Sequence, residues 1–164
     1  MYTYPDALGG GPPPDAAAAT PDAASPPDAS PPDALPCTGG DNSQVYETNG
    51  HCYLYFDEAL SWGEASARCS ARVAHLVTVT DQAEDTFVTQ LVGDRAVWMG
   101  ASDTAAEGTF VWVTGEPFTF TYWLSGQPDN GSNAEDCAHL KGGQGGRWND
   151  DQCGNGTRYV CERD

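Results

Sequence analysis

Hydrophobic residues recur at helical spacing in the first half of the chain. Trp62, Ala65 and Cys69 lie three and four residues apart, which places them on one face of a helix. Ser61 and Glu64 match the capping-box pattern at the start of this run. The spacing therefore predicts a helix that begins after Ser61.

A second run with the same spacing follows Asp81, a residue type that suits a helix N-cap. We expect a second helix there. Its inward residues would be Phe87, Val88, Leu91 and Val92.

The other apolar runs are short and predict strands. Asn49-Gly50 is a hairpin turn signal between two of them, and a Cys37–Cys52 bridge would close this hairpin. The expected strands are residues 45–46, 53–56, 75–79, 96–100, 109–113, 118–120 with 122–123, and 157–161. Helices early in the chain and strands late in it predict an α+β fold. Residues 126–147 contain few apolar residues outside 137–140, so we expect a long loop there.

Residues 1–36 differ in composition from everything that follows. They repeat short units of Pro, Asp and Ala without a helical or strand period. Such a segment cannot bury a core, so we expect an extended or disordered linker. We interpret it as a spacer, with a role in oligomer assembly as the alternative. Residues 37–164 form the expected folded domain, whose length is ordinary for a single core.

The chain is strongly acidic, with 24 acidic residues against 7 basic ones. Five of the acidic residues and none of the basic ones lie in 1–36, so the domain carries 19 acidic against 7 basic residues. This balance argues against a nucleic-acid partner, because phosphate binding needs a basic surface. No apolar run is long enough for a membrane helix, and 1–36 lack the apolar segment of a signal peptide.

All six cysteines lie in the expected domain. An even number in a small acidic domain indicates a disulfide framework and an extracellular, secreted or cell-surface location, reached with an export signal that this sequence does not contain. Zinc binding by the cysteines is disfavoured because no CxxC pair occurs. Spacing alone leaves fifteen connectivities open. The cysteines are Cys37, Cys52, Cys69, Cys137, Cys153 and Cys161.

Residues 127–153 concentrate oxygen-bearing side chains between two cysteines. Carboxylate and amide oxygens are the ligands that a hard cation such as Ca²⁺ prefers. The alternative is a surface loop whose polar residues only keep it solvated. The residues are Gln127, Asp129, Asn130, Asn133, Glu135, Asp136, Asn149, Asp150 and Asp151.

Several short motifs occur in an order that resembles the C-type lectin-like domains. The resemblance covers nearly all of residues 37–164. It implies the long form of that fold, with two helices, two small antiparallel sheets and a long calcium-binding loop. It also implies three disulfides, Cys37–Cys52, Cys69–Cys161 and Cys137–Cys153. The motifs are Trp62-Gly63-Glu64-Ala65, His75-Leu76-Val77, Trp98-Met99-Gly100-Ala101, Gln127-Pro128-Asp129, Glu135-Asp136-Cys137, Trp148-Asn149-Asp150 and Cys161-Glu162.

The resemblance also implies a ligand set for the cation. The principal Ca²⁺ site would consist of Gln127, Asp129, Glu135, Asn149 and Asp150, with a cis bond before Pro128. Two adjacent sugar hydroxyls would coordinate the ion and hydrogen-bond to Gln127, Asp129, Glu135 and Asn149. A second site of some members maps onto Asp103, Glu107, Asn130 and Asp136.

The order Gln-Pro-Asp resembles the galactose-preferring members of the family. We therefore expect glycans of the galactose or N-acetylgalactosamine type as partners. Gly131 stands where such members usually carry a tryptophan that stacks on the sugar. The other candidates for a sugar-stacking face are Trp123, His139 and Trp148, of which we expect Trp148 in the core and His139 in the framework.

Two other classes of function remain as alternatives. The first is a calcium-stabilised domain that binds a protein, lipid or ice surface instead of a sugar. The second is an enzyme, which the sequence does not favour: no nucleophile motif occurs and His51, His75 and His139 are scattered. Asp150 and Asp151 would point to opposite faces of a strand, so they do not form a catalytic carboxylate pair. We expect no catalytic residues.

Overall fold

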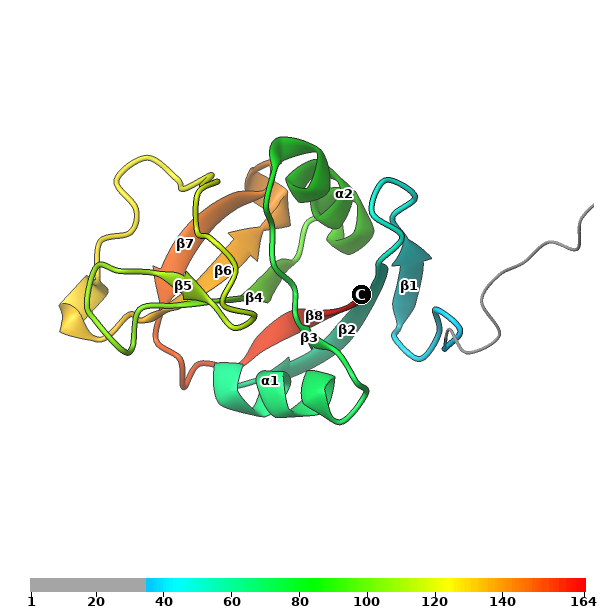
Figure 1. Ribbon diagram of the computed structural model, residues 1–164. Helices are drawn as coiled ribbons and strands as arrows, with labels where there is room; N and C mark the ends of the chain where they lie inside the picture. The colour runs from blue at the N-terminus through cyan, green and yellow to red at the C-terminus, as the bar shows by residue number, and fades with distance from the viewer. Residues whose placement is uncertain (1–34) are drawn as a thin grey trace, which may run out of the picture. The chain divides into compact units, whose positions relative to one another are not determined.

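A computed structural model of the chain describes residues 35–164 (Figure 1). The expected linker, residues 1–36, thus lies almost entirely outside the described residues. No helix in the described part of the chain is long and apolar enough to cross a bilayer.

Both expected helices are present and begin at the expected caps. Helix α1 spans Trp62–Ser70, and its N-cap Ser61 forms the complete capping box with Glu64. Helix α2 spans Gln82–Val92, and the side chain of Asp81 accepts hydrogen bonds from the first turn. These bonds satisfy backbone amides that would otherwise lack partners at the helix start. The sequence prediction of both helices is confirmed.

Eight strands form one connected sheet in the order β1-β2-β8-β4-β6-β7, with β3 beside β8 and β5 beside β4. Most neighbours are antiparallel, but β4 and β8 pair in parallel at Val97–Arg158 and Trp98–Tyr159. The two expected antiparallel ladders are therefore joined into one sheet. The strands are β1 Asn42–Val45, β2 Cys52–Leu60, β3 His75–Leu76, β4 Ala96–Ser102, β5 Val111–Trp112, β6 Cys137–Lys141, β7 Arg147–Asp151 and β8 Thr157–Arg163, with 3-10 turns at η1 Gly131–Asn133 and η2 Gly142–Gln144.

The prediction of a long loop over residues 126–147 is wrong in one part. Its short apolar run, 137–140, forms β6, which pairs with β4 on one side and β7 on the other. The expected strand at 118–123 is also wrong, since only Trp123 forms a single bridge with Trp148. The rings of Phe118, Phe120 and Trp123 instead contact the Trp148 ring, with centroids 5.6–6.2 Å apart. Aromatic packing, not strand pairing, accounts for the apolar pattern there.

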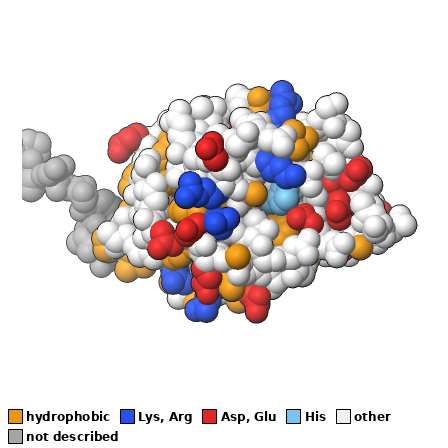
Figure 2. Space-filling model, turned by 180° about the vertical axis from the view of Figure 1, so that it is seen from behind, with side chains coloured by type: hydrophobic (Ala, Val, Ile, Leu, Met, Phe, Trp, Pro, Cys, Tyr) orange, Lys and Arg blue, Asp and Glu red, His pale blue; other side chains and the backbone are white. Residues whose placement is uncertain are grey.

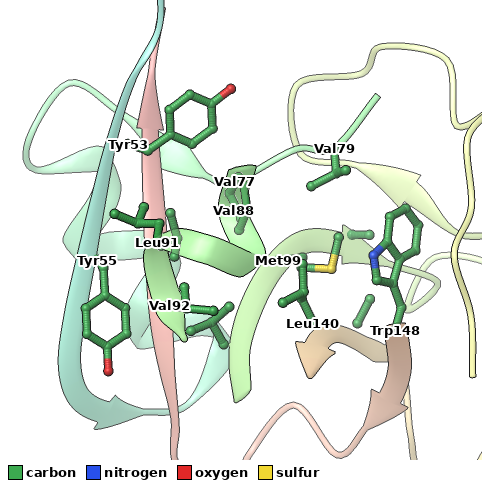
Figure 3. Close-up of a cluster of buried hydrophobic side chains, with 14 of the residues drawn as sticks. Tyr53, Tyr55, Val77, Val79, Val88, Leu91, Val92, Met99, Leu140 and Trp148 are labelled. Carbon is green, nitrogen blue, oxygen red and sulfur yellow. The ribbon is translucent and has the colours of Figure 1, made fainter. Parts of the chain in front are cut away.

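Two buried clusters form the core. Residues Val88, Leu91 and Val92 of α2 belong to one cluster, and Ala65 and Cys69 of α1 belong to the other. Figure 1 shows the two helices on opposite sides of β2 and β8. Figure 3 shows the first cluster, where Leu140 and Trp148 enter from β6 and β7. The core thus extends from the helices to the strands that flank the polar loop.

Three disulfides join the described cysteines as the resemblance implied. They are Cys37–Cys52, Cys69–Cys161 and Cys137–Cys153, with Cα–Cα distances of 5.4, 5.3 and 5.1 Å. Cys69–Cys161 connects α1 to β8, and Cys137–Cys153 connects the start of β6 to the residues after β7. The Cys137–Cys153 bridge thus ties the end of the polar loop, where β6 begins, to the segment that follows β7.

Candidate metal centre

Three carboxylates converge at the tip of the polar loop. Asp129, Glu135 and Asp150 each offer one oxygen, and these oxygens lie within 4.8 Å of one another. Asp150 comes from β7, whereas the other two come from the loop on either side of η1. Segments about twenty residues apart in the chain therefore meet at one point, which we call the loop cluster.

Strand β7 explains why Asp150 faces this point. Its residues alternate between buried and less buried positions, so Trp148 and Asp150 share the inward face. Trp148 is fully buried and Asp150 is 1% exposed. Pairing of Asp150 with Ala138 of β6 fixes the register of the strand. The core residue Trp148 thereby positions the carboxylate two residues later.

Backbone amides hold the carboxylates of the loop cluster in place. The amides of Asp129 and Asn130 donate to the two oxygens of Asp150 at 3.2 and 2.7 Å. The amide of Gly131 donates to Glu135 at 3.1 Å, and the Glu135 amide donates to the Asn130 side chain at 3.1 Å. Asn130, Ser132 and Asn133 adopt positive φ angles, which non-glycine residues rarely adopt outside constrained sites.

The two expected amide ligands adjoin the loop cluster. Gln127 accepts a hydrogen bond from the Asp129 amide at 3.1 Å through its side-chain oxygen. The side-chain amide of Asn149 donates to the backbone carbonyl of Asp150. The Gln127–Pro128 peptide bond is cis, as the resemblance implied.

The charges of the loop cluster oppose one another. Among residues 35–164, no Lys, Arg or His forms an ion pair with Asp129, Glu135 or Asp150. Desolvation raises the pKa of Glu135, and the charges of Asp150, Asp151 and Asp129 raise it further. Figure 2 shows acidic side chains at the end of the domain that carries the loop. A cation at this point would relieve the repulsion, so the residues fit a hard divalent ion.

Comparisons with known proteins assign the family. The family model described as Lectin C-type domain matches residues 58–163. The chain belongs to this family. The C-type lectin domain therefore accounts for the helices, the sheet and the loop described above, and the resemblance seen in the sequence is confirmed.

Individual relatives agree with this assignment. An alpha-N-acetylgalactosamine-specific lectin of Patiria pectinifera is 35% identical over 126 residues, 70% of this chain and 74% of that protein. C-type lectin domain family 17, member A of Homo sapiens is 38% identical over 115 residues, 70% of this chain. The match spans about 30% of the length of the human protein. Carbohydrate-binding lectins are thus among the relatives of this C-type lectin domain.

A solved structure supports the fold. The C-type lectin CEL-I from Cucumaria echinata matches with a TM-score of 0.67 and 29% identity, covering 76% of this chain and 96% of that chain. The match confirms the α+β fold that the sequence predicted.

The residues expected at a second ion site of the C-type lectin domain do not converge like the first set. Among the described residues, Asp103, Glu107 and Asp136 are not brought together as a group of three ligands within 4.8 Å. Asp103 is 2% exposed, and one of its oxygens has no hydrogen-bond partner. Desolvation raises the pKa of Asp103, with Asp136 and Asp150 adding to the shift. Asn130 is engaged with the Glu135 amide instead.

Burial decides which aromatic residues could stack on a sugar. Trp148 is fully buried and His139 is 5% exposed, so neither offers a face to a ligand. Burial lowers the pKa of His139 to about 4, which keeps the ring neutral within the framework. Trp123 remains partly exposed. Trp148 therefore lies in the core and His139 in the framework, as expected.

Gly131 also has a structural role, in addition to leaving the site without a stacking ring. A Cβ atom at this position would lie 2.8 Å from the Glu135 carboxylate. The glycine therefore lets the backbone approach a candidate ligand closely enough for the Gly131 amide to donate to it. Sequence reasoning identified the glycine but missed this contact, because the contact depends on the fold of η1.

A second group of candidate ligands also escaped sequence reasoning. The structure brings together His51, Glu162 and Asp164, whose ligand atoms lie within 4.8 Å of one another. More than one hundred residues separate His51 from Glu162. No local spacing signals this group, since sheet pairing alone creates it.

Proposed function

We propose that this C-type lectin domain binds galactose- or N-acetylgalactosamine-type glycans in a calcium-dependent manner. The observation that carries the proposal is the loop cluster, where three carboxylates meet without a basic partner among the described residues. Gln127 and Asn149 complete the proposed ligand set. An oxygen-only set of this kind suits Ca²⁺.

The proposed ligands supply both halves of sugar recognition. Bound Ca²⁺ would accept lone pairs from two adjacent sugar hydroxyls. The carboxylates of Asp129 and Glu135 would accept hydrogen bonds from these hydroxyls, and the side-chain amides of Gln127 and Asn149 would donate to them. Hydrogen bonds to charged groups are the stronger ones. Exchange of acid and amide around the ion would exchange acceptor and donor positions.

The preference for galactose rests on two supports. The first is the order Gln127-Pro128-Asp129, which resembles that of the galactose-preferring members of the family. The second is the relative from Patiria pectinifera, a lectin described as specific for alpha-N-acetylgalactosamine.

The test is retention on immobilised galactose with Ca²⁺ and elution with a chelator. We expect Gln127→Glu combined with Asp129→Asn to move the preference toward mannose-type sugars, because the donor and acceptor positions change places. Calcium titration of the same variants reports whether the ion still binds. Retention that survives the chelator would contradict the proposal. Calcium binding without retention of any glycan on a broad array would favour a protein, lipid or ice surface as the ligand.

A further inference from the structure

Three potential metal ligands, His51, Glu162 and Asp164, gather where β8 ends, and His75 adjoins them through Asp164. The Nδ1 atom of His51 lies 2.7 Å from Glu162 Oε1 and 3.5 Å from Asp164 Oδ1. The Nε2 atom of His75 lies 3.3 Å from the same oxygen of Asp164. We call His51, His75, Glu162 and Asp164 the β8 cluster. None of its members belongs to the loop cluster.

The hydrogen bonding of His75 leaves one ring nitrogen available. Its Nδ1 atom lies 2.9 Å from the Leu76 carbonyl, which can only accept a hydrogen bond. Nδ1 therefore donates to this carbonyl, which orients Nε2 toward the Asp164 carboxylate at 3.3 Å. Metal-binding histidines are commonly oriented in this way, with the other nitrogen donating to a carbonyl.

Glu162 is the rigid member of the β8 cluster. Its side chain is 2% exposed. Oε2 accepts from the amide and hydroxyl of Thr78 at 3.0 and 3.1 Å. Oε1 lies 3.0 Å from the Tyr53 hydroxyl, whose single proton also faces Glu84 at 2.5 Å. Sheet pairing places Glu162 opposite Tyr53 on one side and His75 on the other. The surrounding groups thus fix this carboxylate before any ligand binds.

The β8 cluster borders an acidic cavity of about 230 Å³. Four carboxylates line the cavity, from Glu84, Glu116, Glu162 and Asp164, and no Lys or Arg is among its lining residues. Its charge therefore favours a cation over an anion or an apolar ligand.

We propose that His51, Glu162 and Asp164 bind a divalent transition-metal ion of the zinc class, with His75 positioning the Asp164 carboxylate. One imidazole nitrogen and two carboxylate oxygens, with water in the fourth position, form a ligand set that zinc accepts, whereas calcium prefers oxygen alone. The ion would connect the residue before β2 to the end of β8. It would bind independently of the ion at the loop cluster.

The test is a zinc titration of the whole chain by calorimetry with Ca²⁺ kept at saturation. We expect one tightly bound zinc ion per chain. Cobalt bound in its place should give the intense visible absorption of a four-coordinate site. The combined variant His51→Gln with His75→Gln should bind zinc about 100-fold more weakly. Asp129→Asn, in the loop cluster, should retain the zinc ion.

Two further measurements separate a loss of zinc binding from a loss of folding. Asp164→Asn changes a side chain that is 71% exposed, so it should weaken zinc binding without unfolding the domain. Thermal unfolding in chelator checks that each variant folds. Zinc affinity unchanged in both the double variant and Asp164→Asn would overturn the proposal. So would competitive displacement of zinc by calcium at similar concentrations.

Discussion

The hydrophobic core and the loop cluster meet on β7, where Trp148 belongs to the core and Asp150 to the loop cluster. The two regions differ in whether they need a ligand. Trp148 is fully buried, and its indole donates to Asp85 at 2.8 Å. Asp150 is equally buried but faces two other carboxylates. The core is complete without a ligand, whereas the loop cluster retains unbalanced negative charge. Stability and ligand binding should therefore separate, with mutations in one region leaving the other almost unchanged.

Asp150→Asn should produce the largest effect on binding. It removes a charge from the loop cluster and a carboxylate that accepts two backbone amides. We expect calcium affinity to fall about 100-fold or more and retention on galactose to be lost. In chelator the thermal midpoint should change little, because relief of the charge repulsion is offset by the loss of one oxygen acceptor for a backbone amide.

Asp151→Asn is the matched control, since it changes the neighbouring carboxylate on the other face of β7. Its calcium affinity should stay close to that of the unchanged chain. Equal losses in both variants, measured by calcium titration, would mean that net charge alone governs binding.

Leu140→Ala tests the other side of the comparison. Leu140 is fully buried on β6 and packs in the cluster that contains Trp148. Removal of its side chain should lower the free energy of unfolding by about 2–5 kcal/mol, measured with denaturant in the presence of chelator. Calcium affinity of the folded variant should change by no more than about twofold. A loss of affinity like that of Asp150→Asn would show that the two regions are coupled.

The helix starts and strand β6 differ in how well the sequence predicts them. Ser61 with Glu64, and Asp81, determine the helix starts through local hydrogen bonds, so both starts could be predicted. The short run 137–140 could not be recognised as β6, because its partners β4 and β7 lie elsewhere in the chain.

The sequence also predicts the two candidate sites unequally, because one has a local motif and the other depends on long-range pairing. Family resemblance supplied the residues of the loop cluster, including Gln127-Pro128-Asp129, whereas no motif marked the β8 cluster. His51 and Glu162 meet only because β2 pairs with β8. Long-range pairing thus limits prediction for both fold and function.

Asp85 is an exception within the core, because it is a carboxylate that burial leaves with one unpaired oxygen. Desolvation raises the pKa of Asp85 to about 6, above its ordinary 3.8. The folded state therefore binds the proton more tightly than the unfolded state. The resulting stability is present at acidic pH and is lost as pH rises through about 6.

Asp85→Asn should remove this pH dependence while keeping an oxygen for the Trp148 indole. At pH 8 we expect the variant to be more stable by at most about 3 kcal/mol, the free-energy equivalent of about two pKa units. Below pH 4 the advantage should vanish. Denaturant unfolding across this pH range measures the difference. A gain that is the same at every pH would show that folding leaves the pKa of Asp85 unshifted.

Gly131→Ala should produce the smallest effect and the most local one. Gly131 lacks the positive φ angle of glycine-only positions, so alanine suits its backbone. Its added Cβ would nevertheless lie 2.8 Å from the Glu135 carboxylate and push this candidate ligand aside. We expect calcium affinity to fall about fivefold, or ~1 kcal/mol. Gly154→Ala is the control, because its Cβ would meet no atom within 4 Å. Unchanged calcium affinity in Gly131→Ala would mean that Glu135 can move and still bind. A tryptophan at 131 could then add a stacking face for galactose without loss of the ion.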